Sequence, residues 1–447
     1  MTEAAGLTST VIRCSRAAAR DIPPATLEMA KLCVLDWFGL ALAGSREPLS
    51  VLLREAALAD GALPAATVPG YGRSFSPRQA ALVNGAAGHA LDYDDVNLAM
   101  RVHPTTVILP GLLALAEARR KSGQAVIEAF VAGYEAAGMI GAQLSASHYA
   151  RGFHATGTIG AFGAAAACAH LLELDEAATA RAYGLAGSQA AGLKAQFGAM
   201  AKSLHAGRAA EAGLTSAIWA EAGMTARADI LECPQGFAAT QTDGVPAVSP
   251  SWKGHALDRN LFKYHAACFG THGTLEAIGG LRREGLRPGQ VFAVRLKVDA
   301  GADAMCNIAA PRTGLEAKFS LRFNAVLALH GADTADIATY ADAVVLRPEL
   351  EASRAVATVE LAPPGWPEDL TEVTIATRDG RTLVRRHDIG LPPGDLAMQG
   401  ERLHAKYLAL ATPVIGRERT DRLAAAIDRL EDIDDLAALL ALAAVRA

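Results

Sequence analysis

Most of the chain between Pro24 and about Leu204 shows the hydrophobic periodicity of α-helices, with apolar residues three and four positions apart. The clearest examples are Leu109, Leu112, Leu113 and Ala116, followed by Ile127, Phe130, Val131 and Tyr134. Ser76-Pro77 supplies an N-cap and a first-turn proline for a helix that runs into Asn84. This half of the chain is therefore expected to be all helical.

Small side chains dominate residues 155–192, where 20 of 38 residues are Ala or Gly. Small residues let helix axes approach closely, so the stretch predicts a tightly packed helical core. Gly157, Gly160 and Gly163 have the spacing G-x-x-G-x-x-G, and no strand precedes them. They indicate packing glycines on a helix and not a nucleotide-binding loop.

After Leu286 the pattern changes to that of a smaller α+β region. Alternation over 292–298 predicts a half-buried strand with Phe292, Val294, Leu296 and Val298 on one face, and residues 372–377 and 382–386 flank Asp379-Gly380 as in a hairpin. Thr313-Gly314-Leu315-Glu316 has capping-box spacing, so we expect a helix from there through Ala328. Helical patterning returns from Leu403, and these last helices either cap the small region or fold back on the large one.

Length and charge narrow the function classes. At 447 residues the chain is too long for one ordinary core, which predicts two domains. The net charge is -5 and no run of Lys and Arg exceeds three residues, so nucleic acid is not an expected partner.

The sequence shows no pattern typical of a secretory signal, a membrane span or a disulfide framework. Residues 1–20 carry charges without an apolar run, which does not fit a secretory signal, and the longest charge-free stretch, 152–172, favours a buried soluble helix over a membrane span. Six dispersed cysteines without a C-x-x-C pair suggest reduced thiols. We expect a cytoplasmic protein with no membrane partner.

Polar chemistry is concentrated in residues 88–104, which hold three carboxylates and two histidines between apolar segments. On a helix Asp92, Asp94 and Asp95 cannot all face one way. His89 and Asp92 would lie one turn apart, and a carboxylate that fixes a histidine tautomer is a common device for proton transfer. The alternative is a polar cap network for the helix that begins near Pro104.

A second candidate group follows at Lys202, His205 and Arg208, three residues apart among small residues. At helical spacing they are expected to share a face that binds substrate carboxylates, and a partly buried lysine could also act as a base. The alternative is a solvated helix start. Two further histidine-bearing segments, 148–154 and 263–272, precede apolar helices.

These motifs resemble those of the MmgE/PrpD family, whose members include methylcitrate dehydratase, cis-aconitate decarboxylase and iminodisuccinate epimerase. The resemblance covers most of the chain. It rests on the segments Ala90-Leu91-Asp92-Tyr93-Asp94-Asp95, His103-Pro104, Gly152-Phe153-His154-Ala155-Thr156-Gly157-Thr158-Ile159-Gly160, Gly187-Ser188-Gln189-Ala190-Ala191-Gly192, Lys202-Ser203-Leu204-His205-Ala206-Gly207 and Ala317-Lys318-Phe319-Ser320.

The resemblance implies a mainly α fold, with a large all-helical domain formed by residues 1–268 and 403–447 and a smaller α+β lid domain formed by 269–402. It also implies a homodimer and a cleft site without cofactor. Dispersed cysteines give no ligand spacing for an iron–sulfur cluster, and no metal is expected, although Asp92, Asp95 and His103 remain a conceivable metal set.

The same resemblance assigns site residues by motif. It implies catalytic roles for Asp92, His103, Lys202 and His272, and places Tyr149 and His154 in the cleft. We take His103 and Lys202 as acid–base groups, Asp92 as the residue that orients a histidine, and His272 as a second proton carrier. Substrate carboxylates are assigned to Arg101, His205 and Arg208.

The expected function is a cofactor-free lyase, of dehydratase or decarboxylase type, that abstracts an α-proton from a small di- or tricarboxylate. Val96 supplies no hydroxyl where the decarboxylases resemble D-x-D-D-T, and Thr105-Thr106-Val107 replaces the dehydratase's Ser-Asp-Asn. Residues 100–104 are similar to the loop of the epimerase, so an epimerase of a substituted succinate such as iminodisuccinate is one alternative. A non-catalytic carboxylate-binding protein is the other.

Overall fold

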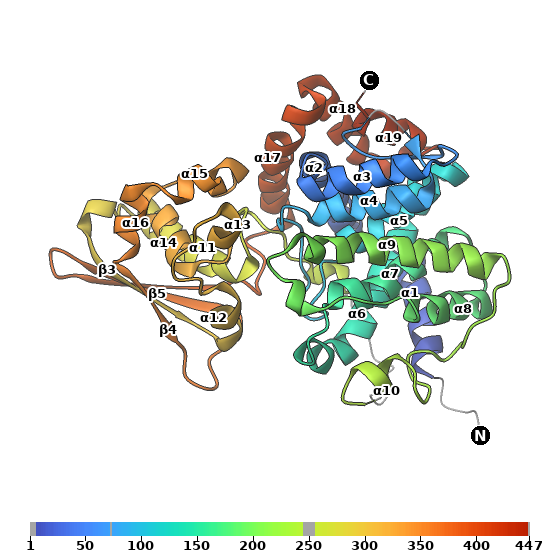
Figure 1. Cartoon of the computed structure of the whole chain (residues 1–447), viewed down its shortest axis with the longest axis horizontal. Helices are drawn as coiled ribbons and strands as arrows, with labels where there is room; N and C mark the ends of the chain where they lie inside the picture. Colours follow the sequence, from blue (N-terminus) through green and yellow to red (C-terminus); the bar gives the residue numbers. More distant parts are fainter. Residues whose placement is uncertain (1–5, 72–73, 245–254, 446–447) are drawn as a thin grey trace. The chain divides into compact units, whose positions relative to one another are not determined.

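The structure, a computed structural model, describes residues 6–71, 74–244 and 255–445. The chain divides into two compact units (Figure 1). The first comprises Met1–Phe262 and Gly394–Ala447, and the second comprises Lys263–Pro393. Both junctions fall before the predicted ones at 268/269 and 402/403. The later junction moves because the helix expected from Leu403 already begins at Leu396, where the Asp395 side chain accepts a hydrogen bond from Met398 N.

The first unit is a bundle of helices with one short antiparallel pair of strands. Its helices are α1 Leu7–Arg20, α2 Pro24–Gly44, α3 Pro48–Asp60, α4 Pro77–His89, α5 Pro104–Arg119, α6 Gly123–Ala150, α7 Ala155–Leu171, α8 Glu176–Gly187, α9 Met200–Glu221, α10 Phe237–Gln241, α17 Leu396–Ile415, α18 Arg417–Ile427 and α19 Ala437–Ala443. The two strands are β1 Ala66–Thr67 and β2 Ser74–Phe75.

Close helix contacts in this unit depend on glycine. A Cβ added at Gly85 of α4 would lie 2.8 Å from the Cα of Gly207 in α9, and one at Gly163 of α7 would lie 2.9 Å from the Ala137 Cβ of α6. Any larger side chain would push these axes apart. The glycines at 157, 160 and 163 are therefore packing glycines, as predicted.

Two apolar helices of the first unit are core helices. The charge-free stretch forms α7, which is buried along almost its whole length. Among the described residues α6 is the one helix long and apolar enough to cross a membrane, and its most apolar window is 83% buried inside the protein. That degree of burial is typical of a core helix.

The second unit is an α+β structure, so the predicted fold class, mainly α with a smaller α+β part, is confirmed. Its sheet has the order β4-β3-β5-β6, in which β3 and β4 are parallel and the other neighbours are antiparallel. The strands are β3 Val291–Val298, β4 Ala357–Leu361, β5 Leu370–Thr377 and β6 Thr382–Asp388, and the helices are α11 His272–Arg283, α12 Ala300–Cys306, α13 Gly314–Lys318, α14 Leu321–His330, α15 Asp342–Val345 and α16 Pro348–Arg354.

The hairpin β5–β6 is confirmed, and Gly380 in its turn has φ 85°, a conformation that favours glycine. Two local predictions are wrong. Phe292 is 64% exposed, because an irregularity in register between Val291 and Ala293 turns it off the buried face. The single helix expected from Thr313 through Ala328 is instead two helices. The first, α13, ends at Lys318, and Ser320 then caps α14 by accepting a hydrogen bond from Phe323 N.

Candidate active site

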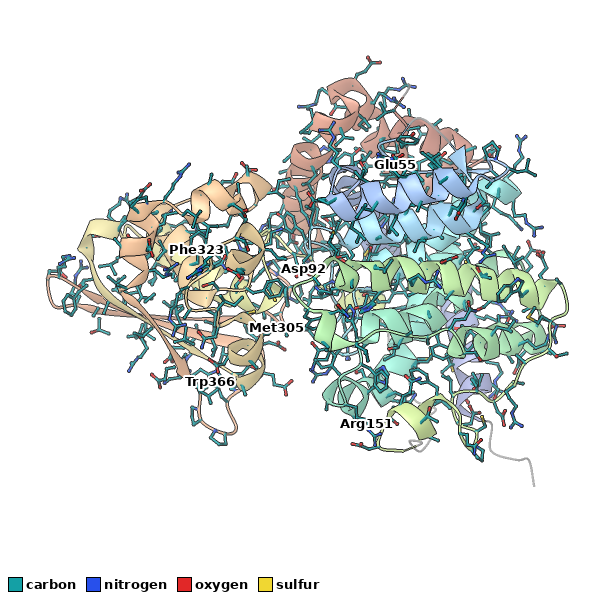
Figure 2. The ribbon with its side chains drawn as sticks, in the orientation of Figure 1. Glu55, Asp92, Arg151, Met305, Phe323 and Trp366 are labelled. Carbon is teal, nitrogen blue, oxygen red and sulfur yellow. The ribbon has the colours of Figure 1, made fainter. Side chains whose placement is uncertain are left out.

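The loop between α4 and α5 carries the central residues of the site. It is tied down by two bridges, Val96 to Leu261 and Asn97 to Val102. Asp92 and Arg101 have φ values of 51° and 53°, which are unusual for residues other than glycine. Such conformations persist where the surroundings impose them, and they are concentrated at functional sites. Figure 2 marks Asp92 on this loop.

Asp94 binds two histidines from the two ends of the loop. Its carboxylate oxygens lie 2.9 and 2.8 Å from His89 Nδ1, and Oδ2 lies 3.3 Å from His103 Nδ1. Burial raises the pKa of this carboxyl, but the two histidines outweigh burial and hold the pKa well below its ordinary value. The histidines thus favour the ionised form of Asp94, which is hydrogen-bonded to His89 Nδ1, while His103 Nδ1 lies at ion-pair distance. Sequence reasoning assigned the orientation of a histidine to Asp92 and missed Asp94.

The two histidines differ in access. The His89 side chain is 0% exposed, whereas that of His103 is 13% exposed. His103 is the N-cap residue of α5, and its own backbone N–H donates to Thr156 Oγ1 at 3.2 Å. Of the pair bound by Asp94, His103 is the one that can reach a ligand.

Asp92 pairs with Lys202. Lys202 Nζ lies 2.7 Å from Asp92 Oδ1, and the two side chains are 11% and 9% exposed. The close crossing of α4 and α9 brings the residues together, and Ser203 Oγ adds a bond to His89 O at 3.0 Å. Charged hydrogen bonds of this length are among the stronger polar contacts in proteins.

Asp95 points elsewhere, which confirms that the three aspartates do not face one way. Its Oδ2 accepts from Thr105 Oγ1 at 2.6 Å, in the first turn of α5. Burial raises the pKa of this carboxyl to about 7, and the charges of Asp94 and Asp36 add to the effect. The cap-network interpretation thus describes Asp95, while Asp92 and Asp94 contact Lys202 and the histidines.

His154 and His205 form a second pair, with their Nδ1 atoms 3.0 Å apart. Burial lowers the pKa of both imidazoles, and the charge of Lys202 lowers them further. One imidazole must donate and the other accept, so a single proton lies between the two Nδ1 atoms, and the lowered pKa values favour neutral rings. The ring of His154 lies 6.2 Å from that of His89, which joins this pair to the loop.

Lys202, His205 and Arg208 were predicted to share one face of α9, and this prediction is wrong for Arg208. Lys202 and His205 belong to the groups above, but Arg208 is exposed and bonds Glu211 on the surface. Positions three apart rotate by about 60° around a helix, so the third member has moved about 120° from the first. Arg101 and Tyr149 do meet, with Arg101 Cζ 5.5 Å from the ring centroid.

His272 belongs to the second unit and opens α11. Its Nε2 lies 3.2 Å from Ala267 O, and its ring lies 4.9 Å from that of His265. Burial lowers the pKa of His272 well below its ordinary value, and the charges of His265 and Lys263 act in the same direction. His265 in turn contacts Thr334 and Glu276.

Among the residues that the structure describes, one group of side chains could hold a metal ion. His89, Asp92, Asp94 and His103 offer ligand atoms that all lie within 4.8 Å of one another. The donor set suits a transition metal, but such an ion would compete with Lys202 for Asp92 and with the two histidines for Asp94. The set suggested from the sequence does not form, because Asp95 is bonded to Thr105. The absence of a metal remains a prediction.

Comparison with known proteins matches two family models. The MmgE/PrpD N-terminal domain matches residues 13–248, and the MmgE/PrpD C-terminal domain matches residues 265–432. The second match runs through α17 and into the last helices, which the compact units place with the N-terminal part.

Similar curated proteins include cis-aconitate decarboxylase from Homo sapiens, which is 27% identical over 384 residues, or 82% of this chain and 79% of that protein. The cis-aconitate decarboxylase of Aspergillus terreus is 32% identical over 296 residues, or 62% of this chain and 60% of its own length. The family and these relatives support an enzyme. With both family models matched over most of its length, the chain belongs to the MmgE/PrpD family.

Proposed function

We propose that this protein is a lyase that acts on a small di- or tricarboxylate through a carbanion next to a carboxylate, without cofactor, with decarboxylation as its first candidate reaction. The observation that carries the proposal is the Asp94 carboxyl group between His89 and His103, beside the Lys202–Asp92 ion pair. The similarity to two proteins named cis-aconitate decarboxylase supports the choice of reaction.

His103 is the proton-transfer residue in this proposal. Its Nδ1 lies 3.3 Å from Asp94 Oδ2, and in this proposal Nε2 is the atom that meets the substrate. The ionised carboxylate stabilises positive charge on the imidazole, so His103 can take a proton and return it. The buried His89 holds Asp94 from the other side and keeps the carboxylate in place.

Lys202 stabilises the negative charge that develops during the reaction. A carbanion next to a carboxylate shares its electron pair with the carboxylate oxygens, and a positioned ammonium group lowers the energy of that state. The bond to Asp92 fixes the ammonium before the substrate arrives, so little reorganisation is needed during the reaction.

Both lyase reactions fit these residues. In decarboxylation the C–C bond to one carboxylate breaks, the electron pair stays on carbon, CO₂ leaves, and a proton from His103 or Lys202 adds to that carbon. In dehydration a base removes the α-proton, the electron pair forms the double bond, and the hydroxyl leaves with a proton from an acid. Decarboxylation requires one proton donor and one cation, whereas dehydration requires a base and an acid in addition to the cation.

The test follows the substrate by proton NMR in deuterium oxide, after exhaustive chelation of the protein. The panel is cis-aconitate, a 2-hydroxytricarboxylate and both enantiomers of a substituted succinate. We expect loss of CO₂ from cis-aconitate and one deuterium in the product, with no need for added metal. Loss of activity on chelation that a particular metal restores would contradict the cofactor-free claim.

The same experiment separates the alternatives. Interconversion of the succinate enantiomers with α-deuterium incorporation and no elimination would instead identify an epimerase. Binding of the panel without any exchange or product would identify a carboxylate-binding protein.

A further inference from the structure

A second group of positive charge lies around Tyr149 in the first unit. Lys194 Nζ is 3.8 Å from the centroid of the Tyr149 ring and donates to Tyr149 O at 3.2 Å. Arg101 Cζ is 5.5 Å from the same centroid. Two cations thus share one aromatic ring, which attracts both. Sequence reasoning singled out Arg101 and Tyr149 but passed over Lys194.

The segment that carries Lys194 is directly connected to the site. Gly192 O accepts from His154 N at 3.0 Å, and Leu193 forms a bridge with Phe153. Three residues beyond Lys194, the Phe197 ring lies 5.0 Å from the His154 ring and 5.5 Å from Lys202 Nζ. Residues 192–197 therefore wrap around the histidine pair.

Arg101 is connected to the site through a different segment, the loop between α4 and α5. Arg101 is two residues before His103, and the pairing of Asn97 with Val102 fixes the backbone between them. Its positive φ directs the chain sharply at this point. Arg101 is exposed and Lys194 is half-buried, so a solute can reach both.

The catalytic candidates of the first unit together supply little net positive charge. Lys202 is matched by Asp92, and Asp94 faces the two histidines. The lowered pKa values of His154 and His205 favour their neutral forms. A substrate with two or three carboxylates carries more negative charge than this group offsets, so an additional cation close by is required.

Lys194 meets that requirement. Among the described residues Lys194 has no carboxylate partner, and its ammonium group contacts the ring and the backbone carbonyl of Tyr149. Partial burial lowers the pKa of Lys194, and the positive charge of Arg101 lowers it further. An anion between the two cations would relieve that repulsion.

We propose that Lys194, together with Arg101 and with Tyr149 as their platform, binds the substrate carboxylate farthest from the reacting carbon. Lys194 is then a specificity-determining residue that selects tricarboxylates over dicarboxylates. The inference rests on the proposed function in one respect, namely that the ligand is a polycarboxylate.

The test is direct binding, measured by isothermal titration calorimetry with propane-1,2,3-tricarboxylate and with succinate. Lys194→Met should weaken binding of the tricarboxylate by about tenfold or more, the usual effect of losing a charged hydrogen bond, and change succinate binding by less than about twofold. Lys194→Arg should retain most of the preference. Lys121→Met is the matched control, because Lys121 is also half-buried but pairs with Glu173, and it should change neither affinity.

Equal weakening of both ligands by Lys194→Met, or no weakening of the tricarboxylate, would overturn the inference. Failure of the unmodified protein to prefer the tricarboxylate would overturn it as well. The measurement needs no turnover, so absence of lyase activity would count against the proposed reaction alone.

Discussion

Two lysine–aspartate ion pairs in the first unit have the same length and different surroundings. Lys202 and Asp92 are 2.7 Å apart with side chains 11% and 9% exposed, and Lys406 and Asp36 are 2.7 Å apart with side chains 3% exposed. The first pair lies beside the Asp94–His103 group. The second is enclosed by α2 and α17, and Lys406 also donates to Tyr93 O at 2.8 Å.

The difference shows that distance alone does not distinguish a site from a structural contact. A buried ion pair gains little net stability, because desolvation of the charges offsets their attraction. The two pairs differ in the exposure of their side chains to solvent and in the presence of other titratable groups nearby. Lys406 holds the backbone of the loop between α4 and α5 at Tyr93, whereas Lys202 is available to a ligand.

The largest expected effect is on activity at the accessible pair. Lys202→Ala and His103→Ala should each lower kcat by roughly 10²–10⁴-fold, since each removes a group needed for proton transfer or charge stabilisation. Steady-state kinetics provide the measurement, on the substrate that the deuterium oxide experiment identifies, with circular dichroism to check folding. If both variants keep near-normal kcat, the catalytic assignment is wrong.

The next effect is on stability at the enclosed pair. Lys406→Met leaves the Asp36 carboxylate buried without its cation, which should lower the free energy of unfolding by about 3–5 kcal/mol. Urea denaturation measures this, and a double variant with Asp36→Leu should recover most of the loss. Lys31→Met is the control, because Lys31 pairs with Glu431 nearer the surface and should cost less than about 1 kcal/mol. If Lys406→Met were as stable as Lys31→Met, the enclosed pair would not differ from a surface pair, and the prediction would be wrong.

A pH-dependent effect on stability separates the neighbouring carboxyls Asp94 and Asp95. The raised pKa of Asp95, about 7, means that the folded protein keeps a proton that the unfolded chain releases near pH 4. This carboxyl therefore lowers stability as the pH rises from about 4 to about 7, by at most about 1.4 kcal/mol per pH unit. Asp95→Asn should remove that decline, as measured by denaturation across this range.

Asp94 should behave in the opposite way. Because its pKa is lowered in the folded state, its contribution is present above the unfolded value and is lost as the pH falls through the folded value. Asp94→Asn should therefore destabilise the protein at neutral pH. The same pH response from both variants would refute the opposite environments of the two carboxyls.

Local structure was largely predictable from the sequence. The helix that begins at Ser76-Pro77, the packing glycines of α7 and the hairpin at Asp379-Gly380 each depend on residues close together in the chain. Capping, helical period and turn chemistry are local effects, so the local sequence carries them. The irregularity in register that exposes Phe292 leaves no such signal.

The partners of the site residues were decided by the tertiary structure. Asp92 and Lys202 are 110 residues apart, and Lys406 meets Tyr93 across 313 residues. The sequence by itself determined that acids, histidines and lysines were present within apolar stretches of the chain, and its motifs indicated the family. It could not determine that Asp94 contacts the histidines while Asp92 pairs with Lys202, or that Arg208 turns away to the surface. Those outcomes depend on where α4 crosses α9 and on a loop that leaves helical geometry at Asp92, because rotation about the helix axis and backbone φ together decide which way each side chain points.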